Sequence, residues 1–203
     1  MRKIYLSISI LFLFQICNAQ TFKAHLATGI NASQIEGDRD AGYNKVDFNG
    51  GVGVGFNISD RWFLGTEFLY SRRGSRNAFI VDNSEPSGQI VLDYVDVPIV
   101  ARIGDWYVEE GEYNKVWAEA GFSVGRLLNA RIDGSNMPEL VNEFRINDLS
   151  YIGGVGYNLN KHFFVNLRYT RSIIPIFSNP EATGLEIARL TSYFLTLRIG
   201  YTL

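Results

Sequence analysis

The sequence has almost no cysteine or histidine, and this scarcity excludes several classes of function. Only 1 Cys and 2 His occur among its 203 residues. A single thiol cannot build a disulfide framework or a cysteine-based zinc site, and two imidazoles leave little material for a histidine-rich metal centre. The formal net charge is -2, with no basic block of the kind that nucleic-acid binding needs. We therefore expect no metal, no cofactor and no nucleic-acid partner.

Long apolar runs are also scarce. The one run of this kind lies at the N-terminus. A short basic start precedes the apolar segment 4–16, and Cys17-Asn18-Ala19 ends it with a small residue. This layout is typical of a secretory signal peptide, and the run is shorter than the ~20 residues that a membrane-spanning helix needs. We predict a signal peptide over 1–19, cleaved before Gln20, and one domain over 20–203. If that domain crosses a membrane, it crosses as strands.

Glycine and aromatic residues are abundant, and apolar residues recur at every second position. The sequence has 20 Gly and is 14% aromatic. A period of two places alternate side chains on one face of a strand. Eight segments show it, each close to the ~9–11 residues of a tilted membrane strand: 22–32, 48–58, 62–72, 91–103, 116–125, 151–159, 163–170 and 192–203. The pattern predicts eight strands.

The two faces of these strands differ in size and polarity. One face carries large aliphatic and aromatic side chains, whereas the other carries Gly, Ser, Asn and isolated charges. The small polar face cannot form a water-excluding core, so the large face must meet lipid. A strand edge in lipid would leave backbone groups unpaired, so the sheet has to close. The predicted fold is all-β, an eight-stranded antiparallel up-and-down transmembrane β-barrel.

The connections between the segments alternate in length. Long polar connections lie near 33–47, 73–88, 129–148 and 174–190, whereas Ser59-Asp60 and the segment 160–162 are short, with a middling one near 105–115. Outer-membrane barrels have short periplasmic turns and long extracellular loops. We therefore expect an outer-membrane location with both termini in the periplasm.

Seven charged residues fall on the predicted inner face. An eight-stranded barrel is only wide enough for side chains to fill it, and unpaired buried charges carry a large desolvation cost. We expect these residues to pair and plug the lumen, a narrow gated channel being the alternative: Lys23, Glu67, Asp96, Arg102, Glu119, Arg168 and Arg198.

A second group of basic residues falls at the predicted outer ends of the strands. Arginine binds phosphate bidentately, so such a rim suits the phosphates of lipopolysaccharide, with ordinary solvation of the loops as the alternative. The group consists of Arg72, Arg73, Arg76, Arg131 and Arg171.

Four stretches show a further pattern: the runs Glu67–Gly74 and Leu92–Ile99, the glycine-rich Gly50–Gly55 and the closing Leu197–Tyr201. They resemble the outer membrane protein beta-barrel domain family, the small porin-like or PorT-like barrels of Gram-negative outer membranes. The resemblance implies an eight-stranded outer-membrane barrel and brings no catalytic motif.

Two classes of function follow from these features, and an enzyme is not expected. The first is a non-enzymatic barrel with a filled interior, whose long loops serve a binding, structural or secretion-accessory role. Its partners would be outer-membrane lipid, lipopolysaccharide or an envelope or secretion protein. The alternative is a small porin-like channel or envelope transporter.

Overall fold

Eight long antiparallel strands form a closed ring. The computed structural model describes residues 22–37, 42–76, 89–133, 143–178 and 189–203. The strands are β1 (Phe22–Glu36), β2 (Lys45–Asn57), β3 (Trp62–Arg76), β4 (Gln89–Val108), β5 (Tyr113–Asp133), β6 (Asn147–Asn158), β7 (Phe163–Ser172) and β9 (Arg189–Thr202). Each strand pairs with the next, and β1 pairs with β9. The all-β, eight-stranded, up-and-down barrel is therefore confirmed; the predicted signal peptide lies outside the described residues and stays a prediction.

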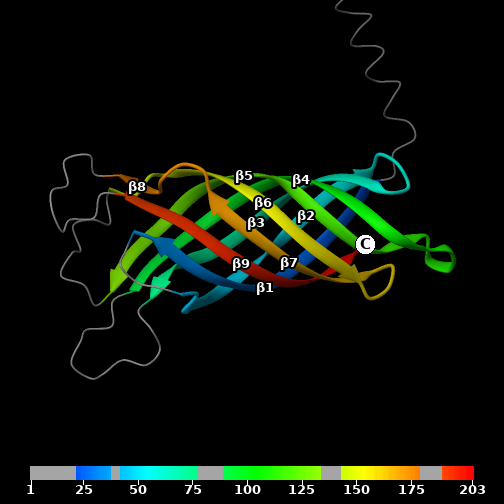
Figure 1. Ribbon diagram of the computed structural model, residues 1–203, viewed down its shortest axis with the longest axis horizontal. Coiled ribbons are helices and arrows are strands. Elements are labelled where there is room, and N and C mark those ends of the chain that lie inside the picture. Colours follow the sequence, from blue (N-terminus) through cyan, green and yellow to red (C-terminus); the bar gives the residue numbers. More distant parts are fainter. Residues whose placement is uncertain (1–21, 38–41, 77–88, 134–142, 179–188) are drawn as a thin grey trace, which may run out of the picture.

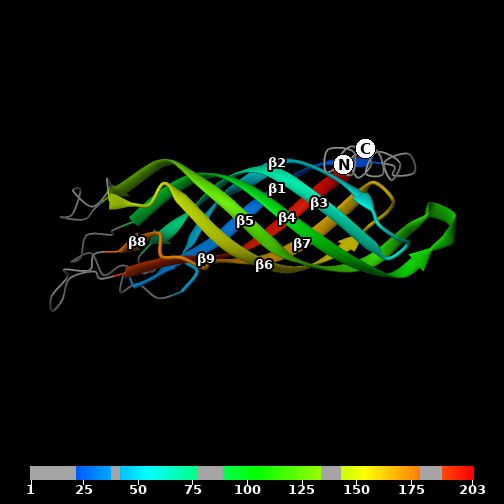
Figure 2. The same ribbon diagram turned by 90° about the horizontal axis from the view of Figure 1, so that it is seen from above.

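The barrel has two unlike ends. The short connections β2–β3, β4–β5 and β6–β7 lie at the end where the chain terminates (Figure 1). The β4–β5 hairpin, which holds a 3-10 turn at Glu109–Gly111, projects beyond the other strands there (Figure 2). Phe22 opens β1 at the same end, and the backbone N–H of Leu203 donates to the carbonyl of Ala24. We call this the short-turn end and the opposite one the long-loop end.

Several strands are longer than a membrane crossing requires. β4 has 20 residues and β5 has 21, about twice the ~9–11 that span a bilayer. Strand pairing therefore continues into segments predicted as loops, such as 129–133 and the part of 73–88 that belongs to β3. Antiparallel pairing needs no lipid, because water tolerates a paired backbone as readily as a bilayer does.

The apolar and polar faces are inverted relative to a soluble protein. On β9, the outward Leu197 keeps 49% of its surface exposed, whereas the inward Arg198 keeps only 1%. The same contrast separates the exposed Phe122 from the buried Ser123 on β5. Within the described ranges, no helix has the length and apolar character needed to span a membrane.

Inward-facing glycines make room for large side chains in the lumen. Gly156 lies opposite Trp117, and a Cβ on it would overlap the indole ring. Gly200 lies opposite Phe164, where a Cβ would overlap the phenyl ring. The glycine-rich inner face is therefore one half of a packed arrangement whose other half is aromatic.

An apolar cluster fills the lumen towards the long-loop end. Its buried members are Ile35, Leu92, Tyr94, Phe144, Ile176, Phe177 and Leu190. Phe177 comes from the short strand β8 (Phe177–Ser178), which pairs with β9, and Phe144 comes from the connection before β6. The register of β4 and β5 shifts between Asp93 and Tyr94, so that the partly buried Ala130 and Ile132 pack on this cluster. We call these seven buried residues the apolar stopper.

Candidate functional site: the charged lumen

Glu67 of β3 lies at the centre of the lumen and contacts four basic side chains. Arg168 Nη1 and Arg198 Nη1 donate to its Oε2 at 2.8 and 2.9 Å. Arg102 Nη2 donates to its Oε1 at 3.0 Å, and His25 Nε2 lies 3.3 Å from the same oxygen. The Glu67 side chain is only 1% exposed. A single carboxylate thus ties together strands β1, β3, β4, β7 and β9.

Glu119 of β5 completes this layer of charges. Its Oε1 accepts from Arg168 Nε at 2.7 Å, and its Oε2 accepts from Arg102 Nε at 3.2 Å. Asn166 links the layer further, because its Nδ2 donates to Glu119 at 3.2 Å while its Oδ1 accepts from Arg198 Nη2 at 2.8 Å. We call Glu67, Glu119, Arg102, Arg168 and Arg198 the charge layer; it holds three guanidinium groups against two carboxylates.

The strand register explains how the charge layer assembles. Arg102 and Glu119 are direct cross-strand partners, and Gly154 separates Glu119 from Arg168 in the same row. Because Gly154 has no side chain, the Arg168 guanidinium reaches across it to Glu119. In the β3–β4 ladder the pairing is interrupted between Thr66 and Leu69 with no change of register, and Pro98, which lies opposite Glu67, has no N–H to donate.

A second ionic cluster lies on the long-loop side of the charge layer. Arg73 Nη2 donates to Asp148 Oδ2 at 2.9 Å and lies 3.6 Å from Asp96 Oδ1. Its guanidinium also stacks over Tyr94, with 3.9 Å to the ring centroid. Gly125 separates Asp96 from Asp148 in the register, and a Cβ there would overlap the Asp96 carboxylate and crowd Arg73. The missing side chain therefore allows Arg73 to sit between two acids.

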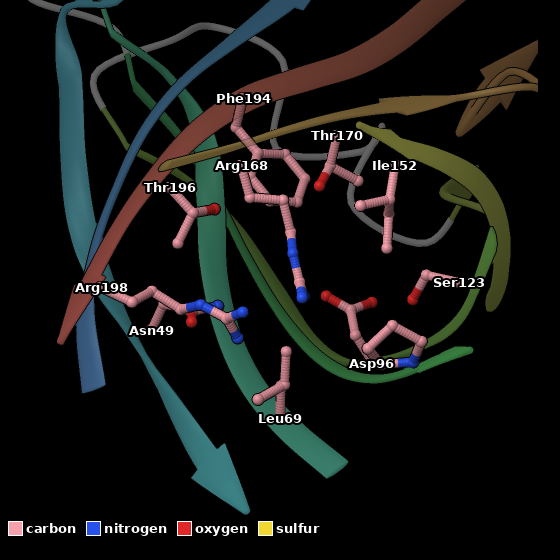
Figure 3. A pocket seen from close by; sticks show the side chains of 11 residues that line it. Asn49, Leu69, Asp96, Ser123, Ile152, Arg168, Thr170, Phe194, Thr196 and Arg198 are labelled. Carbon is pink, nitrogen blue, oxygen red and sulfur yellow. The ribbon is translucent and has the colours of Figure 1, made fainter. Parts of the chain in front are cut away.

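The space between the two clusters is small. A cavity of about 20 Å³ lies there, and Asp96, Arg168 and Arg198 line it together with Asn49 and Ser123. Figure 3 shows Arg168 of β7 and Arg198 of β9 extending into this space, with Asp96 across from Arg168. A cavity of this volume holds about one water molecule, which is far too little for the water column of an aqueous pore.

The structure brings together five of the seven residues predicted to pair in the lumen, and two behave differently. Asp96 pairs with Arg73 in the second cluster and makes no ion pair with the charge layer. Lys23 lies one register step nearer the short-turn end than His25, and within the described part of the chain it forms no ion pair. Lys23 lies near the rim, because β1 begins only at Phe22, and its place in the paired plug stays a prediction.

The predicted outer rim needs one correction. Arg73 is 1% exposed and points into the lumen, because β3 continues to Arg76 and keeps alternating. Arg72 points outward and donates to Asp93 at 2.7 Å, while Arg171 donates to Glu36 at 2.5 Å. Arg76 and Arg131 are exposed at the same end. Four of the five predicted residues therefore lie at the long-loop end on the outside.

Sequence reasoning missed three residues of the two clusters. His25 and Asn166 are not among the predicted lumen charges, although the alternation places them on the inner face. Asp148 was assigned to a loop, whereas it lies at the start of β6. Extending the alternation of β6 by two steps, from Ile152 through Ser150, places Asp148 inside. Among the described residues, no group of three His, Cys, Asp or Glu side chains converges as a metal site.

A closed antiparallel barrel with an apolar exterior and an ionic interior defines an integral outer-membrane β-barrel protein. The sequence model of the outer membrane protein beta-barrel domain family matches residues 5–178. The chain belongs to that family. No curated protein matches this sequence.

Solved structures of small outer-membrane barrels are similar to this chain. Neisserial surface protein A is 14% identical, with a TM-score of 0.49, and the match covers 91% of this chain and 99% of the other. The Yersinia pestis attachment invasion locus protein Ail, in complex with the heparin analogue sucrose octasulfate, is 14% identical, with a TM-score of 0.48, covering 90% and 99%. OprG of Pseudomonas aeruginosa is 13% identical, with a TM-score of 0.42, covering 91% and 97%.

Proposed function

We propose that this protein is a non-conducting outer-membrane barrel whose long-loop end serves a binding, structural or secretion-accessory role. The observation that carries the proposal is the filling of the lumen at three successive levels. The charge layer, the Arg73 cluster and the apolar stopper follow one another along the axis. With such an interior, the surfaces left for partners are the outside wall and the two ends.

Purified protein in a planar lipid bilayer is expected to give no steady conductance. The apolar stopper excludes water, and the ionic layers are held by paired side chains of several strands. An established porin, inserted into the same bilayer, is the control for the recording. Reproducible current steps from the wild-type protein would contradict the proposal and favour the channel or transporter alternative.

We propose further that residues 1–19 are a signal peptide and that both termini face the periplasm. The basic start and apolar run carry the first point, and the clustering of short turns at the end with Phe22 and Leu203 supports the second. N-terminal sequencing of the protein extracted from outer membranes is expected to begin at Gln20 or within a few residues of it. A mature chain that begins at Met1 would overturn the cleavage.

Lipid is the partner that the outside wall supports most directly, and lipopolysaccharide is proposed at the long-loop end. Arg72 and Arg171 already pair with Asp93 and Glu36, so they are less free to bind phosphate than their exposure indicates. Arg131 is exposed and has no ion pair within the described ranges. Crosslinking in outer membranes followed by pull-down would identify an envelope or secretion protein partner at the loops.

A further inference from the structure

The lumen widens at the short-turn end into a cavity of about 440 Å³. Its inner limit is the charge layer, since Arg102 and His25 line the cavity and both contact Glu67. The β2–β3 turn and the β4–β5 hairpin form its mouth through Ser59, Asp60 and Glu112. A cavity of this size fits a small molecule and cannot admit a folded domain. We call it the vestibule.

The deeper walls of the vestibule are aromatic and tightly held. Trp117 and Phe164 are 8% and 3% exposed and pack edge to face, with 6.3 Å between ring centroids. Each ring is seated over an opposite glycine, Gly156 or Gly200. Phe63 lies on the same wall, with the guanidinium of Arg102 5.1 Å from its ring. Rings fixed in this way provide a preformed apolar surface, which lowers the entropy cost of binding a flat apolar group.

The charges around the vestibule favour an anion. Four basic residues line it against two carboxylates: Lys23, Arg61, Arg102 and Lys161 against Asp60 and Glu112. Arg102 also belongs to the charge layer beneath, whose other two guanidinium groups, Arg168 and Arg198, balance its two carboxylates. A narrow cleft with walls of low dielectric concentrates such a field.

Two cations stand out as direct ligands. The Nε and Nη2 atoms of Arg102 bond to Glu119 and Glu67, while its side chain stays 12% exposed to the vestibule. Lys23 has no ion pair within the described ranges and lies on the same wall as His25. An anion bound here would gain charge-assisted hydrogen bonds without breaking an existing pair.

We propose that the vestibule binds a small anion with an aromatic body, such as an aromatic phosphate or carboxylate. The anionic group lies between Lys23 and Arg102, and the ring lies against Trp117 and Phe164. Cationic ligands are repelled, and the filled lumen beyond makes the vestibule a binding site with no through path. The proposal depends on the proposed function only for the side from which the ligand arrives, the periplasm. Bilayer recordings therefore test the closed lumen separately from this site.

The experiment uses the full mature barrel in nanodiscs of zwitterionic lipid, titrated with phenyl phosphate and followed by calorimetry. Saturable binding is expected, together with at least about tenfold weaker binding of inorganic phosphate, which lacks the ring. Benzylamine, which has the ring and the opposite charge, is expected not to bind. Equal binding of phenyl phosphate and benzylamine, or of phenyl phosphate and inorganic phosphate, would overturn the proposal, as would no saturable binding.

Two matched variants locate the site. Lys23→Gln is expected to weaken phenyl phosphate binding by about tenfold, because it removes one charge-assisted bond. Lys115→Gln removes the same charge at the same end of the barrel, but Lys115 Nζ lies over the rings of Trp106 and Tyr157 and outside the vestibule lining. It is expected to leave binding unchanged. Equal losses in the two variants would show a general charge effect and overturn the site; thermal unfolding of both variants confirms that each is folded.

Discussion

Replacement of Glu67 by alanine is expected to destabilise the barrel by ~3–5 kcal/mol, the range for removing one partner of a buried ionic group. Glu67 is the carboxylate on which Arg102, Arg168 and Arg198 converge. Without it, Glu119 alone faces three guanidinium groups in a lumen that holds little water. The uncompensated charge, more than the lost hydrogen bonds, sets the size of the effect.

A double-mutant cycle with Arg198 tests this explanation. Arg198 forms its ion pair with Glu67, whereas Arg168 and Arg102 also pair with Glu119. Glu67→Ala combined with Arg198→Met is therefore expected to recover part of the loss, with a coupling of at least about 1 kcal/mol. Urea unfolding of the barrel in lipid vesicles measures each free energy. Ser123→Ala is the inner-face control, because the buried Ser123 Oγ has no hydrogen-bond partner among the described residues. Costs that simply add would contradict the paired layer.

The barrel could be predicted from the sequence because one simple rule governs it. In a closed sheet with lipid outside, every strand must alternate, and the alternation shows both the strand count and the face of each residue. Leu197 outside and Arg198 inside follow from parity alone. The ends of the strands cannot be predicted from this alternation, since pairing continues into polar segments where no lipid enforces the pattern. This is why Arg73 and Asp148, both close to strand ends, were placed in loops.

The partners within the lumen could not be predicted. Parity gives the inner face of each strand but not the height of a residue along the axis, which depends on strand tilt and register. Glu67 on β3 reaches Arg168 on β7 and Arg198 on β9, which are 101 and 131 residues away along the chain. Lys23 lies on the inner face of its strand, as the charge-layer residues do, but it is nearer the short-turn end of the barrel. The apolar stopper was missed for another reason, because Phe144 and Phe177 lie in connections that show no alternation.

Replacement of Leu197 by arginine on the outside wall is expected to cost ~2–4 kcal/mol, the range for arginine on the lipid face near the bilayer midplane. Leu197 lies in a continuous outward row with Ile30 of β1 and Leu167 of β7 as its cross-strand partners. All three side chains are about half exposed, so an arginine there meets lipid on each side. Unfolding of the variant in lipid vesicles measures the cost.

Leu128→Arg is the matched control for the lipid face. Leu128 is at least as exposed as Leu197, but it lies at the register shift of β4 and β5, where it is the extra residue between Leu127 and Asn129. Because this part of β5 belongs to the extension towards the long-loop end, an arginine there is expected to cost ~0–1 kcal/mol, the range near the membrane interface. The difference between the two variants measures the depth of the lipid-facing zone directly. Equal costs, or a larger cost at Leu128, would place the bilayer at a different height on the barrel and contradict the position assigned to its apolar wall.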